Sequence, residues 1–148
     1  MQPLHFPEYT FRFKNKQNNT LIFDVVRKKF VLNTPEEWVR QHVIRFLNID
    51  KKYPLSLINV EKQIEVNGLK KRYDIIVFNI DGSIHILVEC KSYNIAINQT
   101  TFDQIARYNL KLNATYLMVT NGLAHIYCKM LIIEEKYDFL REIPDFSR

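Results

Sequence analysis

The distribution of glycine constrains this chain more than any other feature. There are only three glycines, and each closes a dipeptide typical of tight turns: Asn67-Gly68, Asp81-Gly82 and Asn121-Gly122. Such turns connect antiparallel strands, so the pattern predicts a protein built around β-hairpins. The same scarcity leaves no glycine-rich loop to hold phosphates, which excludes a P-loop ATPase and a dinucleotide-binding fold.

Length, composition and cysteine usage indicate one cytoplasmic domain. The 148 residues are 47% hydrophobic and 25% charged, as in folded globular proteins. No apolar run approaches the ~18 residues of a membrane helix, and the N-terminus lacks a signal-peptide pattern, so we expect no membrane partner. Cys90 and Cys128 lie in apolar segments without C-x-x-C spacing. We expect reduced core thiols; a zinc site that recruits His85 or His125 is the alternative.

The charge distribution is compatible with a nucleic-acid partner. The net charge is +5, and the basic residues gather at Arg27-Lys28-Lys29, Lys51-Lys52 and Lys70-Lys71-Arg72. Clusters of this kind fit a surface that faces nucleic-acid phosphates. A solvated lysine-rich surface is the alternative that charge alone leaves open.

The hydrophobic pattern predicts an α/β fold with a mixed central sheet. We expect strands over 9–14, 20–31, 57–66, 71–80, 84–92, 115–120 and 123–129, with helices over 35–48, 100–112 and 137–143. The first helix has clear start signals, with Thr34 at the N-cap and Pro35 at the first helical position. Thr101 and Gln104 form a candidate capping box for the second helix. We divide the single domain into N-terminal strands (1–33), a core (34–130) and a C-terminal tail (131–148).

The Asp81-Gly82 hairpin brings two acids together. If these two residues form the whole loop, Ile80 pairs with Ser83 and the same register sets Asp74 opposite Glu89. Their Cβ atoms would then lie roughly 5 Å apart on one face of the sheet. Lys91 shares that face because side chains alternate along a strand. Opposed carboxylates repel each other, and a divalent cation would relieve that repulsion.

Other interpretations remain open at this point. Asp74 and Glu89 could be ordinary strand-edge acids with Lys91 and Arg72 as ion-pair partners, and a bulge at Gly82 would separate them. Glu37, in the first helical turn, is either a capping-box residue or a third acid aimed at the site. Gln104 and Tyr108 lie four residues apart and project from one helix face.

These motifs, in this order, resemble the PD-(D/E)XK nuclease superfamily. Asp74 followed by Glu89-Cys90-Lys91 matches its D…(D/E)-x-K signature, and Gln104 to Tyr108 is similar to the Q-x-x-x-Y element of RecB-like members. From about Tyr9 to Lys129 the chain resembles the N-terminal nuclease domain of type I restriction enzyme R subunits. Tyr73 departs from the pattern, since a proline commonly precedes the aspartate.

The resemblance implies a restriction-endonuclease-like αβββαβ core, preceded here by the N-terminal β ribbon, and Mg²⁺-dependent phosphodiester hydrolysis, with Mn²⁺ able to substitute. Asp74, Glu89 and the backbone carbonyl of Cys90 would hold the metal, supported by Glu37. Lys91 would orient or deprotonate the attacking water, and Gln104 and Tyr108 would position Lys91 or the phosphate backbone. The candidate DNA contacts are Arg72, Tyr108, Arg107, Lys111, Lys70 and Lys71.

Two alternatives to an independent DNA endonuclease follow. The chain could be a non-catalytic nuclease-fold module that binds nucleic acid, although a pure binder gains nothing from crowding two acids near phosphates. It could also be the nuclease subunit of a larger complex, with a separate motor or specificity subunit as partner. A homodimer is compatible with all three.

Overall fold

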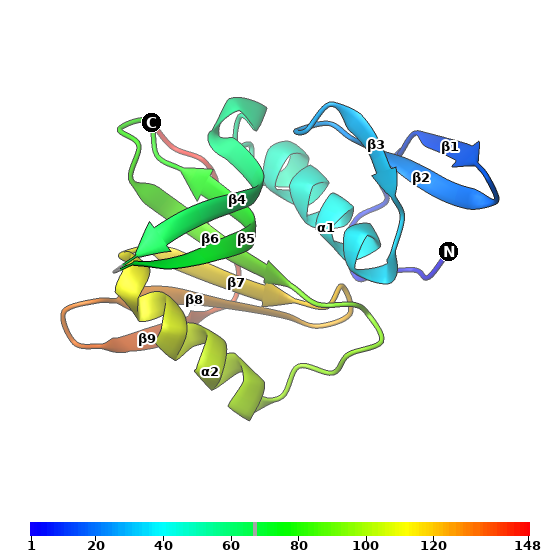
Figure 1. Cartoon of the computed structure of the whole chain (residues 1–148). Helices are drawn as coiled ribbons and strands as arrows, with labels where there is room; N and C mark the ends of the chain where they lie inside the picture. The colour runs from blue at the N-terminus through cyan, green and yellow to red at the C-terminus, as the bar shows by residue number, and fades with distance from the viewer. Residues whose placement is uncertain (67) are drawn as a thin grey trace.

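The computed structural model describes residues 1–66 and 68–148, and within them the chain forms two sheets and two main helices (Figure 1). The smaller sheet is antiparallel and contains β1 (Phe13–Lys16), β2 (Asn19–Asp24) and β3 (Lys29–Leu32). Helix α1 (Pro35–Arg45) follows and continues into a π-helical turn over Phe46–Asp50. The expected N-terminal β ribbon is confirmed, with a third strand made from the second half of the 20–31 segment.

The larger sheet has six strands in the spatial order β4-β5-β6-β7-β8-β9. Its strands are β4 (Ile58–Val66), β5 (Leu69–Phe78), β6 (Ile84–Cys90), β7 (Tyr116–Thr120), β8 (His125–Leu131) and β9 (Lys136–Leu140). β6 and β7 are parallel neighbours and are connected through helix α2 (Gln99–Asn109); the other neighbours are antiparallel. Short 3₁₀ turns cover Leu55–Leu57 and Leu110–Leu112. The α/β class and the mixed sheet are therefore confirmed.

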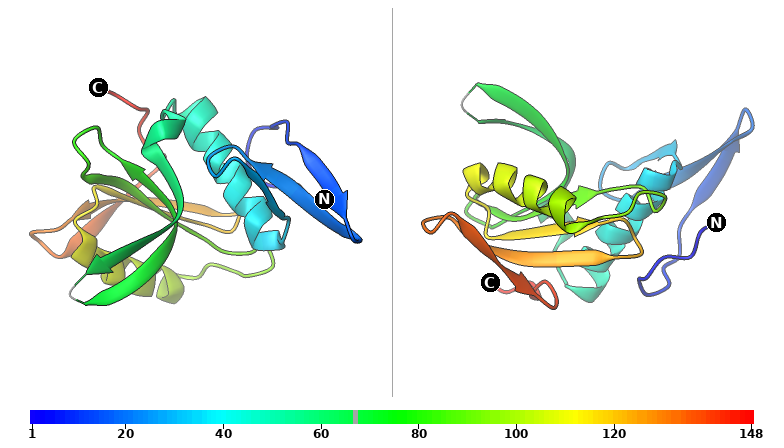
Figure 2. Two further views of the ribbon diagram at one scale, coloured as in Figure 1. Left: turned by 45° about the horizontal axis from the view of Figure 1, so that its top comes forward. Right: turned by 90° about the horizontal axis from the view of Figure 1, so that it is seen from below.

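The two helices cover opposite faces of the large sheet and create two cores. On one face, Val39 and Val43 of α1 pack against Ile75 and Val88. On the other face, the buried side chains of α2 pack against the inner strands; they include Phe102, Ala106, Leu87, Leu117 and Val119. The small sheet lies beyond α1, on the side away from the large sheet (Figures 1 and 2). Cys90 belongs to the first core and Cys128 to the second, both as free buried thiols.

The starts of the helices follow local chemistry. Thr34 caps α1 by accepting a hydrogen bond from the Glu37 amide at 3.1 Å, with Pro35 in the first turn as expected. The cap of α2 is Asn98, which accepts from Thr101 N at 2.8 Å, so the predicted Thr101–Gln104 capping box is wrong. None of the helices in residues 1–66 and 68–148 is long and apolar enough to cross a membrane.

The hairpin between β5 and β6 differs from the predicted two-residue loop. β5 ends at Phe78, and a four-residue turn follows in which Gly82 N donates to Asn79 O at 2.9 Å. Pairing begins with Phe78 opposite Ile84, one step away from the predicted register. His85 is then an extra residue in β6, and this bulge restores the predicted register from the Val77–Ile86 pair onward. Asn67, in the other predicted turn, lies outside the described residues.

The predicted C-terminal helix is wrong. The segment from Lys136 to Leu140 is β9, which pairs antiparallel with β8 at the sheet edge. Its aromatic residues alternate with charged ones, and Tyr137 packs edge-on against Phe102 of α2 at 5.3 Å between ring centroids. This contact across elements favours the strand over the local helical pattern.

Candidate active site

Asp74 lies where β5 loses its regular alternation. Tyr73 and Ile76 both pack in the core beneath α2, while Ile75 packs beneath α1, so the side-chain pattern slips by one position here. The neighbouring strand is distorted at the same level, since Glu61 of β4 has a φ of 54°. Asp74 consequently points toward α1, where Arg40 Nη2 donates to Asp74 Oδ1 at 2.9 Å.

The second oxygen of Asp74 replaces a backbone acceptor. In the described part of the chain, the β5–β6 ladder ends at the Ile75–Val88 pair. Two residues beyond Val88 in β6, the backbone amide of Cys90 donates to the side-chain oxygen Oδ2 of Asp74 at 2.8 Å. The strands separate at this point, and the carboxylate fills the gap between them. Because Cys90 stands between Glu89 and Lys91, this hydrogen bond fixes Asp74 beside the E-x-K segment.

Glu89 is buried on the other side of the sheet and is paired with a cation. Lys71 Nζ donates to Glu89 Oε1 at 2.9 Å, and the same ammonium stands 4.7 Å from the ring centroid of Tyr73 and 4.5 Å from that of Tyr108. Burial raises the pKa of the Glu89 carboxyl; the Lys71 charge lowers it, and the Asp74 carboxylate raises it again.

The prediction that Asp74 and Glu89 stand side by side on one face of the sheet is therefore wrong. Asp74 and Glu89 are close enough for one charge to act on the other, but their carboxylates leave the sheet toward different helices. The reason is the slip at Asp74, which a strict period of two along β5 could not anticipate. The interpretation of Lys91 and Arg72 as their ion-pair partners is also wrong, since Arg40 and Lys71 take those places.

Lys91 differs from Arg40 and Lys71 in having no carboxylate partner among the described residues. Among the described residues, Arg40 and Lys71 have carboxylate oxygens within 4 Å and Lys91 has none. Its backbone amide donates to Thr120 O of β7 at 2.8 Å, which fixes the segment at the end of β6. Its positive charge lowers the pKa of both Glu36 and Glu89, so the ammonium lies near both acids.

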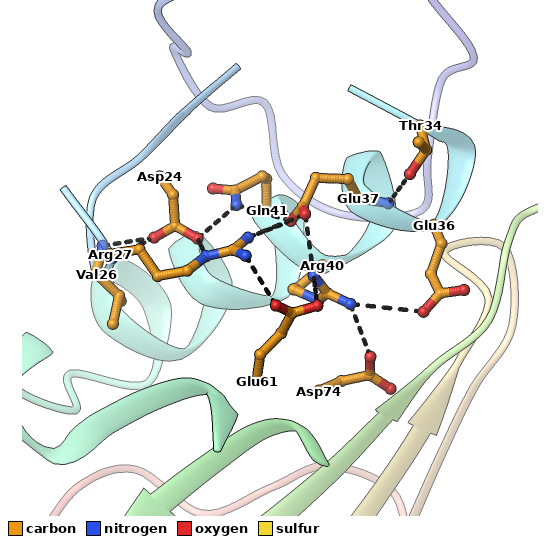
Figure 3. Close-up of polar contacts among 10 residues, drawn as sticks. All are labelled: Asp24, Val26, Arg27, Thr34, Glu36, Glu37, Arg40, Gln41, Glu61 and Asp74. Atoms are coloured by element: carbon orange, nitrogen blue, oxygen red, sulfur yellow. Dashed lines mark hydrogen bonds and ion pairs between the residues drawn. The ribbon is translucent and has the colours of Figure 1, made fainter. Parts of the chain in front are cut away.

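Glu37 does not point at Asp74. Its carboxylate accepts from Arg27 at 2.9 and 3.0 Å, from Arg40 at 2.9 Å and from Gln41 at 3.0 Å, in a buried network (Figure 3). Thr34 N instead donates to Leu32 O, so the side-chain half of the predicted capping box is absent among these residues. Glu37 thus reaches Asp74 only through Arg40.

The neighbouring residue, Glu36, takes the position expected for Glu37. Its carboxylate lies 3.5 Å from Arg40 Nη2, on the same nitrogen that contacts Asp74. Burial raises the pKa of Glu36, and the nearby Asp74 carboxylate raises it further. Successive residues of a helix point in directions about 100° apart, so Glu36 and Glu37 contact different partners. The i to i+4 spacing of Glu36 and Arg40 is the sequence signal that was available.

The remaining candidates are divided between the site and the surface. Tyr108 is half-exposed and connects to Glu89 through Lys71. Lys71 itself, predicted as a DNA contact, is half-buried on Glu89. Gln104 is exposed on α2 and points away from the core. The other predicted DNA contacts are exposed on β5 and on the α2 segment; they are Lys70, Arg72, Arg107 and Lys111.

The donor chemistry fits a hard divalent cation. Asp74 and Glu89 supply carboxylate oxygens; burial is the main cause that raises the pKa of Glu89, and the Asp74 carboxylate raises it further. Across residues 1–66 and 68–148, no three His, Cys, Asp or Glu side chains form a ready-made cage. Mg²⁺ rarely uses such a cage, since it keeps several waters and is held by one or two carboxylates together with substrate phosphates.

Comparison with solved structures supports the α/β fold with a mixed sheet described above. One similar structure is described as a "putative nuclease belonging to DUF820" from Anabaena variabilis. It has a TM-score of 0.50 and 10% sequence identity, and the match covers 87% of this chain and 80% of that chain. At this identity the likeness concerns the fold alone. The fold is therefore of a nuclease-like α/β class, with Asp74 in the middle of β5 and Glu89-Cys90-Lys91 at the end of β6.

The family follows from the sequence. The family model for the type I restriction enzyme R protein N terminus (HSDR_N) matches residues 35–144. This range includes α1, the whole large sheet and α2, so the chain belongs to that family. No curated protein matches the chain.

Proposed function

We propose that this chain is a Mg²⁺-dependent DNA endonuclease whose centre consists of Asp74, Glu89 and Lys91. The observation that carries the proposal is the hydrogen bond from Cys90 N to Asp74 Oδ2, which places Asp74 beside the E-x-K segment. The residue types match the chemistry of phosphodiester hydrolysis, and the family is that of a restriction enzyme subunit. We place the protein in the cytoplasm, where such a substrate is found.

Each residue has a defined task in this proposal. Asp74, Glu89 and the Cys90 carbonyl would hold a Mg²⁺ ion, or Mn²⁺ in its place, and the bound cation would supply polarisation of the scissile phosphate and a lower pKa for the attacking water. Lys91 orients this water and stabilises the charge that builds on the phosphate, because no carboxylate within 4 Å among the described residues neutralises its ammonium. Glu36 replaces Glu37 as the supporting acid from α1.

The surroundings position these groups and the substrate. Tyr108 holds Lys71, and Lys71 in turn holds Glu89. Gln104 and Arg107 of α2, with Lys111 of the following 3₁₀ turn, present exposed polar groups that suit contacts with the DNA backbone. The R-subunit family also favours a partner that supplies translocation or sequence recognition. A homodimer would supply a second centre for the other strand.

A second candidate function has its own supporting observation. Arg40 and Lys71 already neutralise Asp74 and Glu89, which is the arrangement expected of a nuclease fold that binds nucleic acid without cutting it. The two functions differ in what Lys91 does. In an enzyme Lys91 acts in the transition state, whereas in a binding module it is at most one phosphate contact.

Lys91→Ala therefore tests the proposal. We expect metal-dependent cleavage of plasmid DNA to fall by ~100-fold or more while DNA affinity stays within a few-fold. Lys129→Ala, an exposed lysine of β8, is the matched control and keeps wild-type activity. Absence of cleavage by the wild-type protein in Mg²⁺ or Mn²⁺, with DNA binding retained, would establish the binding module instead. Equal cleavage by wild type and Lys91→Ala would remove Lys91 from the centre.

A further inference from the structure

The outer face of the small sheet carries two cations stacked on aromatic rings. The pairing register places Phe23 beside Phe30, and Phe23 N donates to Arg12 O at 2.9 Å. The Arg12 guanidinium lies 4.6 Å from the Phe23 ring centroid and 5.6 Å from that of Phe30. Lys14 Nζ lies 5.6 Å from the Phe30 ring. This face is separate from the centre near Asp74.

The alternation of the strands shows which face is free. Phe13, Ile22 and Val31 are paired neighbours on the inner face, where Ile22 is fully buried and Phe13 meets Trp38 of α1 at 6.2 Å. Phe23 and Phe30 belong to neither core, and Leu32, on their side, is 51% exposed. The outer face therefore has no covering element among the described residues.

The exposed charged side chains of the small sheet are all positive. Arg12, Lys14, Lys16, Lys28 and Lys29 are all exposed. Asp24 is the one acid between residues 12 and 32; it is fully buried and is hydrogen-bonded by Arg27 and Gln41. The exposed charge of the small sheet is therefore entirely positive. A surface of this kind is complementary to a polyanion.

The rings restrict where the cations can go. A guanidinium or ammonium over an aromatic face is held by the ring quadrupole and loses less freedom when it contacts a phosphate. The rings are already covered by these cations, so they are poorly placed to stack on bases. The arrangement favours contacts with the sugar-phosphate backbone, independent of base sequence.

The small sheet is also fixed relative to the candidate centre. Arg27, at the turn between β2 and β3, contacts Glu37 at 2.9 Å; Glu37 contacts Arg40 at 2.9 Å, and Arg40 contacts Asp74 at 2.9 Å (Figure 3). This chain of buried ion pairs links the sheet to Asp74 through α1. A backbone bound on the sheet would thus keep a constant position relative to the centre.

We propose that Arg12 and Lys14, seated on Phe23 and Phe30, form a second, sequence-independent contact for the DNA backbone outside the active site. The proposal rests on DNA as the substrate named above, and it adds a surface that neither the E-x-K segment nor α2 supplies. Its ligand is the phosphate backbone of duplex DNA, with phosphates as the chemical groups recognised.

The test compares Arg12→Ala/Lys14→Ala with Lys129→Ala/Lys136→Ala, a control of equal charge change on exposed residues of β8 and β9. Affinity for a short duplex is measured at several salt concentrations with EDTA present, so that cleavage plays no part. We expect the double variant to bind roughly 10-fold more weakly at low salt, with the slope of log K against log salt reduced by about 2. The control should match wild type, and melting temperatures verify folding.

The outcomes separate this inference from the proposed function. If the Arg12→Ala/Lys14→Ala variant has a reduced salt slope but the wild-type protein never cleaves DNA, the DNA contact on the small sheet is supported and the nuclease function is overturned. If the salt slope of this variant is unchanged and cleavage by the protein requires Lys91, the nuclease function is supported and the DNA contact on the small sheet is overturned. Wild-type protein that binds poly-glutamate but no duplex overturns the surface as a DNA contact and identifies an acidic protein as its partner. Phe23→Leu/Phe30→Leu, which keeps the charge, should lose affinity but keep most of the slope.

Discussion

Arg40 of α1 donates to Asp74 of β5 at 2.9 Å, and both side chains are largely buried, with 8% and 13% of their surfaces exposed. The same guanidinium contacts Glu37 at 2.9 Å and Glu61 at 3.4 Å. The helix and the sheet are thus joined by an arginine that serves several carboxylates at once. Without it, the region around Asp74 would hold a concentration of negative charge that only another cation could offset.

Arg40→Gln should destabilise the fold by about 3 kcal/mol, because it leaves Asp74 buried without its cation and removes one of the two arginines that pair with Glu37. Combining it with Asp74→Asn should recover part of that loss, with a coupling of roughly 1–3 kcal/mol in a double-mutant cycle measured by urea unfolding. Arg45→Gln is the control: it lies in the last turn of the same helix and stacks on Phe11 at 5.4 Å. Strictly additive effects of the Arg40 and Asp74 changes would show that the two side chains act independently.

Local signals explain what the sequence predicted well. Thr34 and Pro35 determine the start of α1 through their own hydrogen bond and backbone angle, so no distant contact is needed. The register near Val88 was predicted correctly although the loop was wrong, because the extra residue at His85 compensates for the longer turn at Gly82. A single glycine dipeptide does not distinguish a two-residue loop from a longer turn followed by a bulge.

The errors arise where contacts across elements decide. Glu36 and Glu37 are both spaced to reach Arg40 along the helix, and the contact with Arg27 draws Glu37 into the buried network. The slip at Asp74 depends on the distortion of the neighbouring strand at Glu61, which no periodicity reveals. Arg40 itself was missed because an arginine on a helix is usually a solvated residue.

Mg²⁺ at millimolar concentration should raise the melting temperature, since a cation that binds only the folded state shifts unfolding by mass action. Asp74→Asn should remove most of this increase, whereas Glu134→Gln, an exposed acid in the β8–β9 turn, should keep it. Differential scanning fluorimetry with matched ionic strength measures both. An increase of the same size in all three proteins would point to nonspecific salt effects and would contradict a site at Asp74.

Lys71→Met should raise the pKa of the Glu89 carboxyl further, because the ammonium now lowers it against the effect of burial. Tyr108→Ala should act in the same direction but more weakly, by releasing the ammonium that stands 4.5 Å from its ring. Tyr108→Phe keeps the ring and should behave as wild type. Titration of the Glu89 side-chain carboxyl by NMR provides the measurement, and a pKa unaffected by Lys71→Met would contradict the ion pair.

Acidification should destabilise the protein through its buried histidines. Burial lowers the pKa of His42, His85 and His125. The unfolded chain therefore binds protons near the ordinary value of 6.5 while the folded chain resists them, and the free energy of unfolding falls as pH decreases through about 6.5. Glu89 contributes to the pH dependence with the opposite sign. Because its pKa is raised in the folded state, the folded protein binds a proton there at a pH above about 4.5, where the unfolded chain does not, and this adds stability as the pH falls.

Two variants separate these contributions. His85→Gln removes one group that the unfolded state protonates, so the dependence of unfolding free energy on pH between 7 and about 5.5 should become shallower. Glu89→Gln removes a group that favours the folded state on acidification, so the dependence should become steeper as the pH is lowered further toward about 4.5. Urea unfolding at intervals of half a pH unit measures both slopes. If the two variants shift the slope in the same direction, the burial of at least one of these side chains is contradicted.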